Sequence, residues 1–216
     1  MRGRKEGLMD HNLFHGKQEL RSKYLAYRDA LSLKERKEKS ERIWELLRGD
    51  ASYRRAQAIL VYMDYRSEVI TTGLAEALFA SGTKRVFAPR VEGMDITFYE
   101  VASMEDFTEG YQKIREPYGE EEKRFAPQQF RGQSILVLVP GAVFDRQKGR
   151  IGYGKGFYDR FLEKLACACE KGGWEEEGAF VRSAALAFDC QLAKKVSVEA
   201  HDRRVDMIIT ETGIIQ

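Results

Sequence analysis

The feature that most constrains the fold of this chain is a series of short apolar runs that alternate with stretches of helical periodicity. The first run, residues 58–63, is rich in β-branched residues, as is typical of a strand buried on both faces of a sheet. Strands that alternate with helices predict an α/β fold with a mostly parallel sheet covered on both faces. The predicted strands span residues 58–63, 85–88, 134–139, 184–188 and 205–210.

The first two predicted helices precede the first strand. An apolar stripe with spacings of four, three and four residues predicts a helix that begins near Lys17. Ser32 and Glu35 form a capping-box pattern for a second helix, which is expected to stop at Gly49. The N-terminal part of the chain is therefore expected to be helical from Lys17 onward.

Further elements follow the first strand. Thr71 or Thr72 is expected to cap a third helix that Gly82 ends, and another helix is predicted over residues 157–165. Residues 95–101 alternate with aromatic side chains on both faces, which indicates an edge strand. The chain therefore contains repeated strand–helix units.

The remaining segments define the expected domain organisation. Residues 107–133 hold prolines, glycines and a cluster of charges, so we expect mostly surface loop. Residues 1–16 are predicted to be a disordered or frayed N-terminal segment. Residues 17–216 then form a single domain, because no linker divides them.

Charge and cysteine content exclude several classes of protein. Lys and Arg number 36 against 34 Asp and Glu, so a net charge of +2 leaves no global footprint for nucleic acid. No window approaches the ~20 apolar residues of a transmembrane helix, and no apolar run marks a signal peptide. Three cysteines indicate a reduced cytoplasmic protein and not a disulfide framework. We therefore expect a cytoplasmic location and neither nucleic-acid nor membrane partners.

The most informative segment for function joins a predicted strand to a helix through Gly152, Gly154 and Gly156. Backbone N–H groups of such a loop, together with the helix N-terminus, can bind phosphate. Lys155 supplies a full positive charge for the same oxygens, and Asp159 in the first helical turn could hold Mg²⁺. The pattern equally allows a glycine-rich turn in which Asp159 merely caps the helix.

No G-x-S-x-G, H-E-x-x-H or paired-cysteine pattern is present, which excludes covalent serine catalysis and zinc hydrolysis.

Four charged residues elsewhere are candidates for ligand contacts. Lys17 and Arg21 share one face of the first helix and could grip a triphosphate, although a solvated helix face explains the same spacing. Glu68 follows the first strand at the edge where open α/β sheets bind ligands. Its carboxylate could accept two hydrogen bonds from a pterin or guanine edge, or complement the next helix dipole. Asp202 offers a second carboxylate in a stretch that alone indicates a loop.

These segments together resemble the 5-formyltetrahydrofolate cyclo-ligase family, also called 5,10-methenyltetrahydrofolate synthetases. The resemblance covers nearly the whole chain from Lys17, in the family's order, and the long glycine segment is its most specific part. The matching motifs are Lys17-x-x-Leu20-Arg21 with Arg28, Glu68-Val69-x-Thr71, Ile114-Arg115-Glu116-Pro117, Pro140-Gly141-x-x-Phe144-Asp145, residues 150–159, and His201-Asp202-x-x-Val205-Asp206.

The resemblance implies a three-layer α/β/α fold related to the NagB, ribose-5-phosphate isomerase and CoA-transferase scaffolds. It implies a ligase that forms carbon–nitrogen bonds and uses MgATP to close 5-formyltetrahydrofolate into 5,10-methenyltetrahydrofolate, with release of ADP and phosphate. ATP would phosphorylate the formyl oxygen before N10 attacks. The folate is expected with or without a polyglutamate tail, and the protein as a monomer, with a weak homodimer as the alternative.

By matched position, the resemblance also implies the site residues. ATP contacts are expected from Lys17, Gln18, Glu19, Leu20, Arg21, Arg150, Ile151, Gly152, Tyr153, Gly154, Lys155, Gly156, Phe157 and Tyr158. Folate contacts are expected from Met63, Glu68, Tyr153, Gly154, Lys155, Gly156 and Phe157. Asp159 and Asp202 are expected to hold Mg²⁺, and Lys155 and Arg150 to be catalytic.

The charged residues and the glycine loop suit an ATP-dependent ring closure. An N-formyl oxygen is a poor leaving group, so ring closure requires its conversion to a phosphate. Such a reaction depends on positioning and charge neutralisation more than on an enzyme nucleophile. We therefore expect Lys155 and the loop amides to stabilise the transferring phosphoryl group, and Glu68 to hold the pterin edge.

Two features depart from the family pattern, and two other functions remain open. Phe157 stands where many relatives have Tyr, and residues 167–182 match nothing. A sugar-phosphate isomerase or CoA-transferase relative would use a carboxylate base or nucleophile without ATP. A folate- or nucleotide-binding protein would keep the pocket without turnover. A nucleic-acid module is disfavoured by the balanced charge.

Overall fold

The computed structural model describes residues 3–172, 178–197, 199 and 202–216. Within them, a central sheet has seven strands in the order β12-β11-β9-β6-β1-β2-β3. Strands β11, β9, β6, β1 and β2 pair in parallel, while the edge strands β12 and β3 run antiparallel to their neighbours. The mostly parallel sheet is therefore confirmed. The strands are β1 (Ala58–Leu60), β2 (Arg85–Glu92), β3 (Asp95–Val101), β6 (Ile135–Val139), β9 (Val181–Leu186), β11 (Met207–Thr210) and β12 (Gly213–Ile215).

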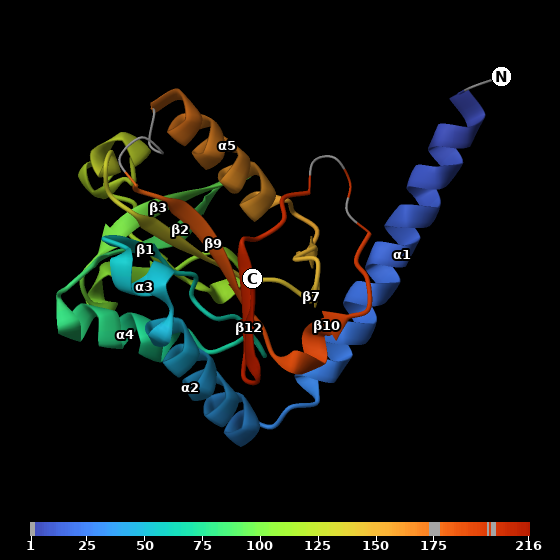
Figure 1. Ribbon diagram of the computed structural model, residues 1–216, viewed down its shortest axis with the longest axis horizontal. Coiled ribbons are helices and arrows are strands. Elements are labelled where there is room, and N and C mark those ends of the chain that lie inside the picture. The colour runs from blue at the N-terminus through green and yellow to red at the C-terminus, as the bar shows by residue number, and fades with distance from the viewer. Residues whose placement is uncertain (1–2, 173–177, 198, 200–201) are drawn as a thin grey trace.

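Helices cover both faces of this sheet (Figure 1). Helix α5 (Phe157–Gly172) lies on one face, and α2 (Leu33–Gly49) and α4 (Thr72–Ser81) lie on the other. The short helix α3 (Ala51–Arg55) connects α2 to β1. Helix α5 is longer than the helix predicted over residues 157–165, because no glycine or proline interrupts it before Gly172.

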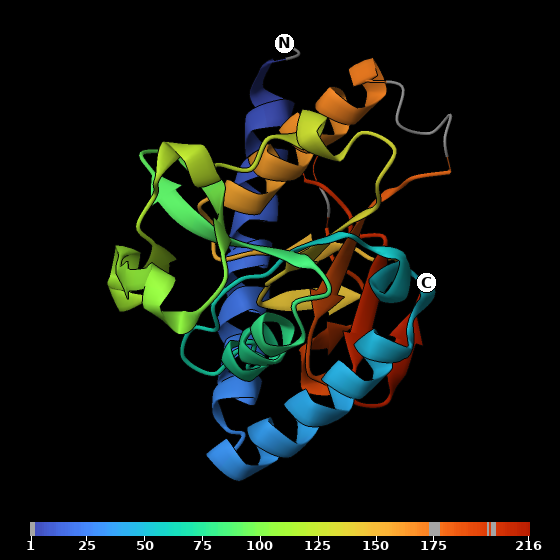
Figure 2. The ribbon, with the colours of Figure 1, turned by 90° about the vertical axis from the view of Figure 1, so that its left-hand side faces the viewer.

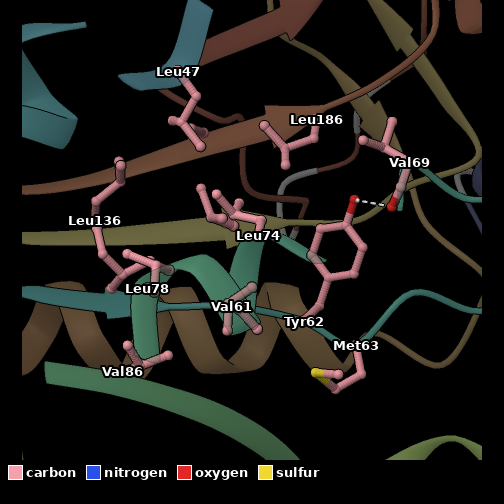
Figure 3. Close-up of a cluster of buried hydrophobic side chains, with 14 of the residues drawn as sticks. Leu47, Val61, Tyr62, Met63, Val69, Leu74, Leu78, Val86, Leu136 and Leu186 are labelled. Atoms are coloured by element: carbon pink, nitrogen blue, oxygen red, sulfur yellow. Dashed lines mark hydrogen bonds between the residues drawn. The ribbon is translucent and has the colours of Figure 1, made fainter. Parts of the chain in front are cut away.

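The inner strands bury both of their faces, as their continuous apolar runs predict. In β1, Ala58 and Leu60 join the cluster under α5, whereas Ile59 joins the cluster under α2 and α4. This alternation follows from the two-residue period of a strand. Figure 3 shows the second cluster, in which Leu47 of α2 and Leu74 of α4 meet the sheet. The two apolar layers fix the sheet between its helices.

Helix α1 (Gly3–Asp29) runs along one side of the molecule and extends beyond it (Figures 1 and 2). It starts at Gly3 and not near Lys17 as expected, because residues 3–16 contain no proline that would interrupt the helix. The helix packs on a second sheet of order β10-β7-β8, made of β7 (Val143–Asp145), β8 (Arg150–Ile151) and β10 (Leu192–Ala193). Neither the sheet nor this packing is apparent from the sequence.

Two helix caps agree with the sequence patterns and one differs. The Ser32–Glu35 capping box is present, and Gly82 ends α4 with a φ of +59°. At the start of α4, however, Thr71 makes no side-chain cap. Asp64 Oδ1 instead accepts hydrogen bonds from the amides of Thr71 and Thr72, at 2.9 and 2.8 Å. The helix dipole is therefore complemented by Asp64 and not by Glu68.

The segment expected to be mostly surface loop is partly buried. It forms the two-stranded sheet β4 (Phe107–Glu109) and β5 (Arg115–Pro117), together with short 3₁₀ turns. Phe125 and Phe130 stack on each other and meet Phe87 of β2 edge-on. These aromatic contacts bury a stretch whose charges and prolines indicate exposure. The 3₁₀ turns are η1 (Met104–Asp106), η2 (Tyr111–Lys113), η3 (Glu121–Lys123) and η4 (Pro127–Phe130), and η6 (Asp189–Gln191) precedes β10.

Candidate active site

A cavity of about 710 Å³ opens beside the carboxyl ends of β1 and β6. Its lining comes from α1, the segments after β1 and β6, the glycine loop before α5, and the loop between β4 and β5. Crevices at the carboxyl ends of parallel strands are where open α/β sheets bind ligands. The predicted site residues that line it are Lys17, Arg21, Met63, Glu68, Arg150, Ile151, Gly152, Tyr153, Gly154, Lys155, Gly156, Phe157, Tyr158, Asp159 and Asp202.

Three predicted ATP contacts do not line this cavity. Gln18 and Glu19 are exposed to solvent, and Leu20 packs on the small sheet against Val143 and its neighbours. The helical period explains this difference, because residues one to three positions after Lys17 point away from the face shared with Arg21. The structure thus brings together the charged residues of the motif and not the intervening ones.

The start of the glycine loop is held by hydrogen bonds to Asp145, a buried residue of β7. Asp145 Oδ1 accepts a hydrogen bond from the Gly149 amide at 2.8 Å, and Oδ2 accepts one from the Val196 amide at 2.7 Å. Further along, Gly154 and Gly156 have φ values of +91° and +65°, which side chains with a Cβ rarely adopt. The loop then enters α5 directly, so its amides and the helix N-terminus face the same cavity.

One end of the cavity centres on Glu68, which is 5% exposed. Glu68 Oε1 accepts a hydrogen bond from the Tyr153 hydroxyl, and Oε2 accepts one from the Tyr65 amide at 2.9 Å. Arg28 of α1 donates to the Tyr153 hydroxyl at 2.6 Å and to Ser67 Oγ at 2.9 Å. Burial raises the pKa of Glu68, while the hydrogen bond from Tyr153 and the charge of Arg28 oppose this rise. A carboxylate held in this way is a ready acceptor for paired N–H donors.

Basic groups gather at the other end. Lys17 Nζ lies 2.7 Å from Glu199 Oε1 and 2.6 Å from Asp202 Oδ2. Arg21 Nε donates to the Gly152 carbonyl at 2.8 Å, which ties α1 to the glycine loop. Burial lowers the pKa of Arg21, yet an arginine remains charged at neutral pH. This end of the cavity therefore combines two cations with two carboxylates, an arrangement that suits a phosphate accompanied by a metal cation.

Arg150 and Asp159 connect the two sides of the glycine loop. Arg150 donates to Asp159 Oδ1 at 2.6 Å and to the Pro140 carbonyl at 3.3 Å. The buried Arg150 Nε has no hydrogen-bond partner within the described part of the chain. The Arg203 amide also donates to Asp159 Oδ1, at 3.2 Å. Both residues line the cavity, and the Arg150 Nε–H is left without a hydrogen-bond acceptor among the described residues.

The acidic residues match the oxygen chemistry that Mg²⁺ prefers. Asp159 and Asp202 both line the cavity. No group of three or more His, Cys, Asp or Glu side chains is placed to hold a metal within the described ranges. Mg²⁺ is commonly held by one or two carboxylates plus substrate phosphates. The donor set therefore fits an ion that enters with a phosphorylated ligand.

Comparison with known proteins identifies the family. The model of the 5-formyltetrahydrofolate cyclo-ligase family matches residues 14–211. The chain belongs to this cyclo-ligase family. It is 28% identical over 170 residues to a probable 5-formyltetrahydrofolate cyclo-ligase of Schizosaccharomyces pombe, covering 76% of this chain and 79% of that protein. It is 26% identical over 187 residues to the 5-formyltetrahydrofolate cyclo-ligase of Mus musculus, covering 84% and 87%.

A solved structure supports the same membership. The structure of Aquifex aeolicus 5,10-methenyltetrahydrofolate synthetase superposes with a TM-score of 0.75 at 28% identity, covering 93% of this chain and 92% of that one. The cyclo-ligase family predicted from the motifs is thus confirmed, together with the enzyme class and the mostly parallel α/β fold. Among the helices of the described residues, none has the length and apolar character needed to cross a membrane.

The cyclo-ligase motifs include residues to which the sequence assigns no role. Arg28 is 2% exposed and lines the cavity, as do Ile114 and Glu116 from the middle motif. Arg28 lies eleven residues after Lys17, so helical spacing places both on one face, and this signal could have found it. Tyr111 has no such signal. It reaches the site because the loop between β4 and β5 brings its ring 6.3 Å from that of Phe157.

The departures from the cyclo-ligase pattern leave the charged residues of the cavity in place. Phe157 keeps an aromatic ring in the cavity lining. In the unmatched segment, residues 167–172 extend α5 and β9 begins at Val181, while residues 173–177 lie outside the described residues. His201 of the last motif also lies outside them, whereas Asp202 is described.

Proposed function

We propose that this chain uses ATP to close 5-formyltetrahydrofolate into 5,10-methenyltetrahydrofolate, with release of ADP and phosphate. Its family membership supports this reaction. The observation that carries the proposal is that one cavity holds both a buried carboxylate, Glu68, and a glycine loop flanked by Lys17, Arg21 and Lys155. A pterin and a triphosphate can therefore meet in one enclosed space.

At the folate end, Glu68 accepts hydrogen bonds from the N–H groups along one edge of the pterin. Each carboxylate oxygen accepts one hydrogen bond in the structure and has capacity for another. Arg28 and Tyr153 hold this carboxylate in place. Met63, in the segment that follows β1, contributes apolar surface against the ring.

At the phosphate end, Lys155 and the loop amides stabilise the transferring phosphoryl group. The formyl oxygen attacks the γ-phosphorus as the bond from that phosphorus to the ADP oxygen breaks. N10 then attacks the formyl carbon, the carbon–oxygen bond breaks, and phosphate leaves with that oxygen. N10 loses its proton, which yields the methenyl bridge. Arg150 binds phosphate oxygens through the guanidinium N–H that no described residue partners.

We also propose that Mg²⁺ binds Asp159 and Asp202 together with the phosphates. When bound, the ion neutralises phosphate charge. Before MgATP binds, ion pairs with Arg150 and Lys17 hold Asp159 and Asp202 at the cavity. The proposed substrates include folates with a polyglutamate tail, and the proposed oligomeric state is a monomer. The proposed location is the cytoplasm, which the three free cysteines support.

A coupled assay tests this function. Purified protein is mixed with 5-formyltetrahydrofolate and MgATP, and methenyltetrahydrofolate absorbance and ADP release are followed together. Equal amounts of both products, lost when ATP or Mg²⁺ is omitted, support the cyclo-ligase reaction. Folate binding without either product supports a binding protein, and turnover of a sugar phosphate or CoA ester without ATP supports the related scaffolds.

The role of Lys155 has its own test. The Lys155→Ala variant should lose about a hundredfold in kcat, as is typical when one group that stabilises developing charge is removed. Lys164→Ala is a matched control, because Lys164 also lies on α5 but pairs with Asp95 outside the cavity. Unchanged turnover in Lys155→Ala, with ATP still bound, would contradict this role.

A further inference from the structure

Tyr158 lines the cavity and carries a hydroxyl group whose role is unexplained. Tyr158 lies in the first turn of α5, and its ring meets Phe98 of β3 edge-on, with 6.4 Å between centroids. Its oxygen is buried and has no hydrogen-bond partner among the described residues. Leaving a buried hydroxyl unpaired destabilises a protein, because the group loses its hydrogen bonds to water. A group of this kind in a cavity wall indicates that a bound molecule completes its hydrogen bonding.

Two other tyrosines that line the cavity, Tyr153 and Tyr62, already use their hydroxyl groups. Tyr153 donates to Glu68 and accepts from Arg28. The hydroxyl of Tyr62 lies 3.5 Å from the Val69 carbonyl (Figure 3). Phe157, the neighbour of Tyr158, has no hydroxyl. The Tyr158 hydroxyl is therefore a donor that no group of the described residues uses.

The position of this hydroxyl relates it to both ends of the site. Burial raises the pKa of Tyr158 far above its ordinary value, the negative charge of Glu68 adds to the rise, and Arg150 opposes it. Tyr158 lines the same cavity as Glu68 at the folate end and Arg150 at the phosphate end. A tyrosine hydroxyl is protonated at neutral pH, so it acts as a donor and not as a base.

We propose that the Tyr158 hydroxyl donates a hydrogen bond to the formyl oxygen of the folate. This inference rests on the proposed function, in which that oxygen is carried by the folate and attacks the γ-phosphorus. The oxygen must therefore lie between the Glu68 end and the phosphate end. A carbonyl oxygen has two lone pairs, so one accepts the hydrogen bond while the other attacks. Matched position places Tyr158 with ATP, whereas the proposed hydrogen bond places its hydroxyl on the folate oxygen that attacks ATP.

Two folates that differ in one oxygen test the inference. Binding of 5-formyltetrahydrofolate and of 5-methyltetrahydrofolate, which lacks the oxygen, is measured by calorimetric titration without ATP. In Tyr158→Phe, affinity for the formyl compound should fall about tenfold, while affinity for the methyl compound stays within about twofold. The value of kcat/KM for 5-formyltetrahydrofolate should fall at least as much. An equal loss for both folates, or no loss, would overturn the inference.

Stability provides an independent readout. Unliganded Tyr158→Phe should unfold at the same urea concentration as the wild type or a higher one, because the substitution removes an unpaired buried hydroxyl. Tyr99→Phe is the control, since Tyr99 does not line the cavity. The substitution removes a hydroxyl that donates a hydrogen bond of 2.6 Å to Glu92. That variant should lose stability and keep its folate affinity.

The outcomes separate the possible errors. If unliganded Tyr158→Phe loses stability like Tyr99→Phe and binds both folates normally, the hydroxyl has an internal partner such as an enclosed water, and the inference fails. If the wild-type protein binds neither folate, the proposed function fails instead.

Discussion

The ammonium group of Lys17 lies 2.6 Å from Oδ2 of Asp202, although 185 residues separate them in the chain. The same nitrogen also pairs with Glu199, so α1 is tied to the segment before β11 at the cavity wall. Lys17 is the proposed phosphate contact and Asp202 the proposed Mg²⁺ ligand. We expect MgATP to exchange this ion pair for one between Lys17 and phosphate and one between Asp202 and the cation.

Removing the charge of Lys17 should weaken ATP binding selectively. In Lys17→Met, KM for MgATP should rise about tenfold, because a charge-assisted contact is lost. The affinity for 5-formyltetrahydrofolate without ATP should change little. Lys164→Met, which removes an exposed ion pair with Asp95, is the control for loss of a lysine charge. An unchanged KM for MgATP in Lys17→Met would refute the phosphate contact.

Glu68 should be required for folate recognition. Glu68→Gln replaces one acceptor oxygen by a donor, so kcat/KM for 5-formyltetrahydrofolate should fall about a hundredfold, mainly through KM. Steady-state kinetics at saturating MgATP measures this loss. Glu100→Gln is the matched control, since Glu100 pairs with Arg85 on the surface of the sheet. Equal losses in both variants would show that the effect is not specific to the site.

The raised pKa of Glu68 should make activity and stability depend on pH with opposite signs. Its folded pKa lies above the ordinary 4.5 because of burial. Only the ionised form accepts both pterin hydrogen bonds, so kcat/KM for the folate should rise as pH increases through the folded pKa. The stability contribution of Glu68 is complete below pH 4.5 and is lost as pH rises through the folded pKa.

Urea unfolding of the wild type and of Glu68→Gln, from below pH 4.5 to above the folded pKa of Glu68, measures how the free energy of unfolding depends on this group. The wild type should lose free energy of unfolding relative to Glu68→Gln as pH rises, because the glutamine does not titrate. A constant difference between the two proteins would show that the pKa of Glu68 is the same folded and unfolded.

Gly141 should tolerate no larger side chain. A Cβ added there would lie 2.5 Å from Cζ of Phe144, which is fully buried. Gly141→Ala should therefore destabilise the protein by about 1–3 kcal/mol through overpacking. Gly49→Ala is the control, because a Cβ at Gly49 meets no atom within 4 Å. Chemical denaturation should find a lower midpoint for Gly141→Ala and an unchanged or higher one for Gly49→Ala.

The strands and helices could be predicted to the extent that local patterns determine them. The apolar runs of β1 and β6 predict doubly buried strands, and Ser32 and Gly82 carry the cap signals that the structure shows. The strand predicted before Pro89 continues to Glu92, however. Beyond Phe87 it pairs with β3 alone, so a residue without an N–H is tolerated there.

The site could be predicted only where its residues belong to a compact motif. The glycine loop with Lys155 and Asp159 is such a motif, because helix initiation and anion binding both depend on neighbouring residues. The role of Arg28 is different. Helical spacing places Arg28 on the face of Lys17, but its guanidinium contacts Ser67 and Tyr153, which come from separate parts of the chain and which that spacing does not predict.

The amino-acid sequence by itself thus determined the alternating α/β pattern, the phosphate-type loop and the family motifs, because each depends on residues within a few turns or strand positions of one another. Tertiary structure alone decided that Lys17 meets Asp202, that Tyr153 connects Arg28 to Glu68, and that Tyr158 keeps an unpartnered hydroxyl. These relationships depend on how distant segments pack. Packing is set by the summed burial of the two apolar layers around the sheet, and not by any local preference.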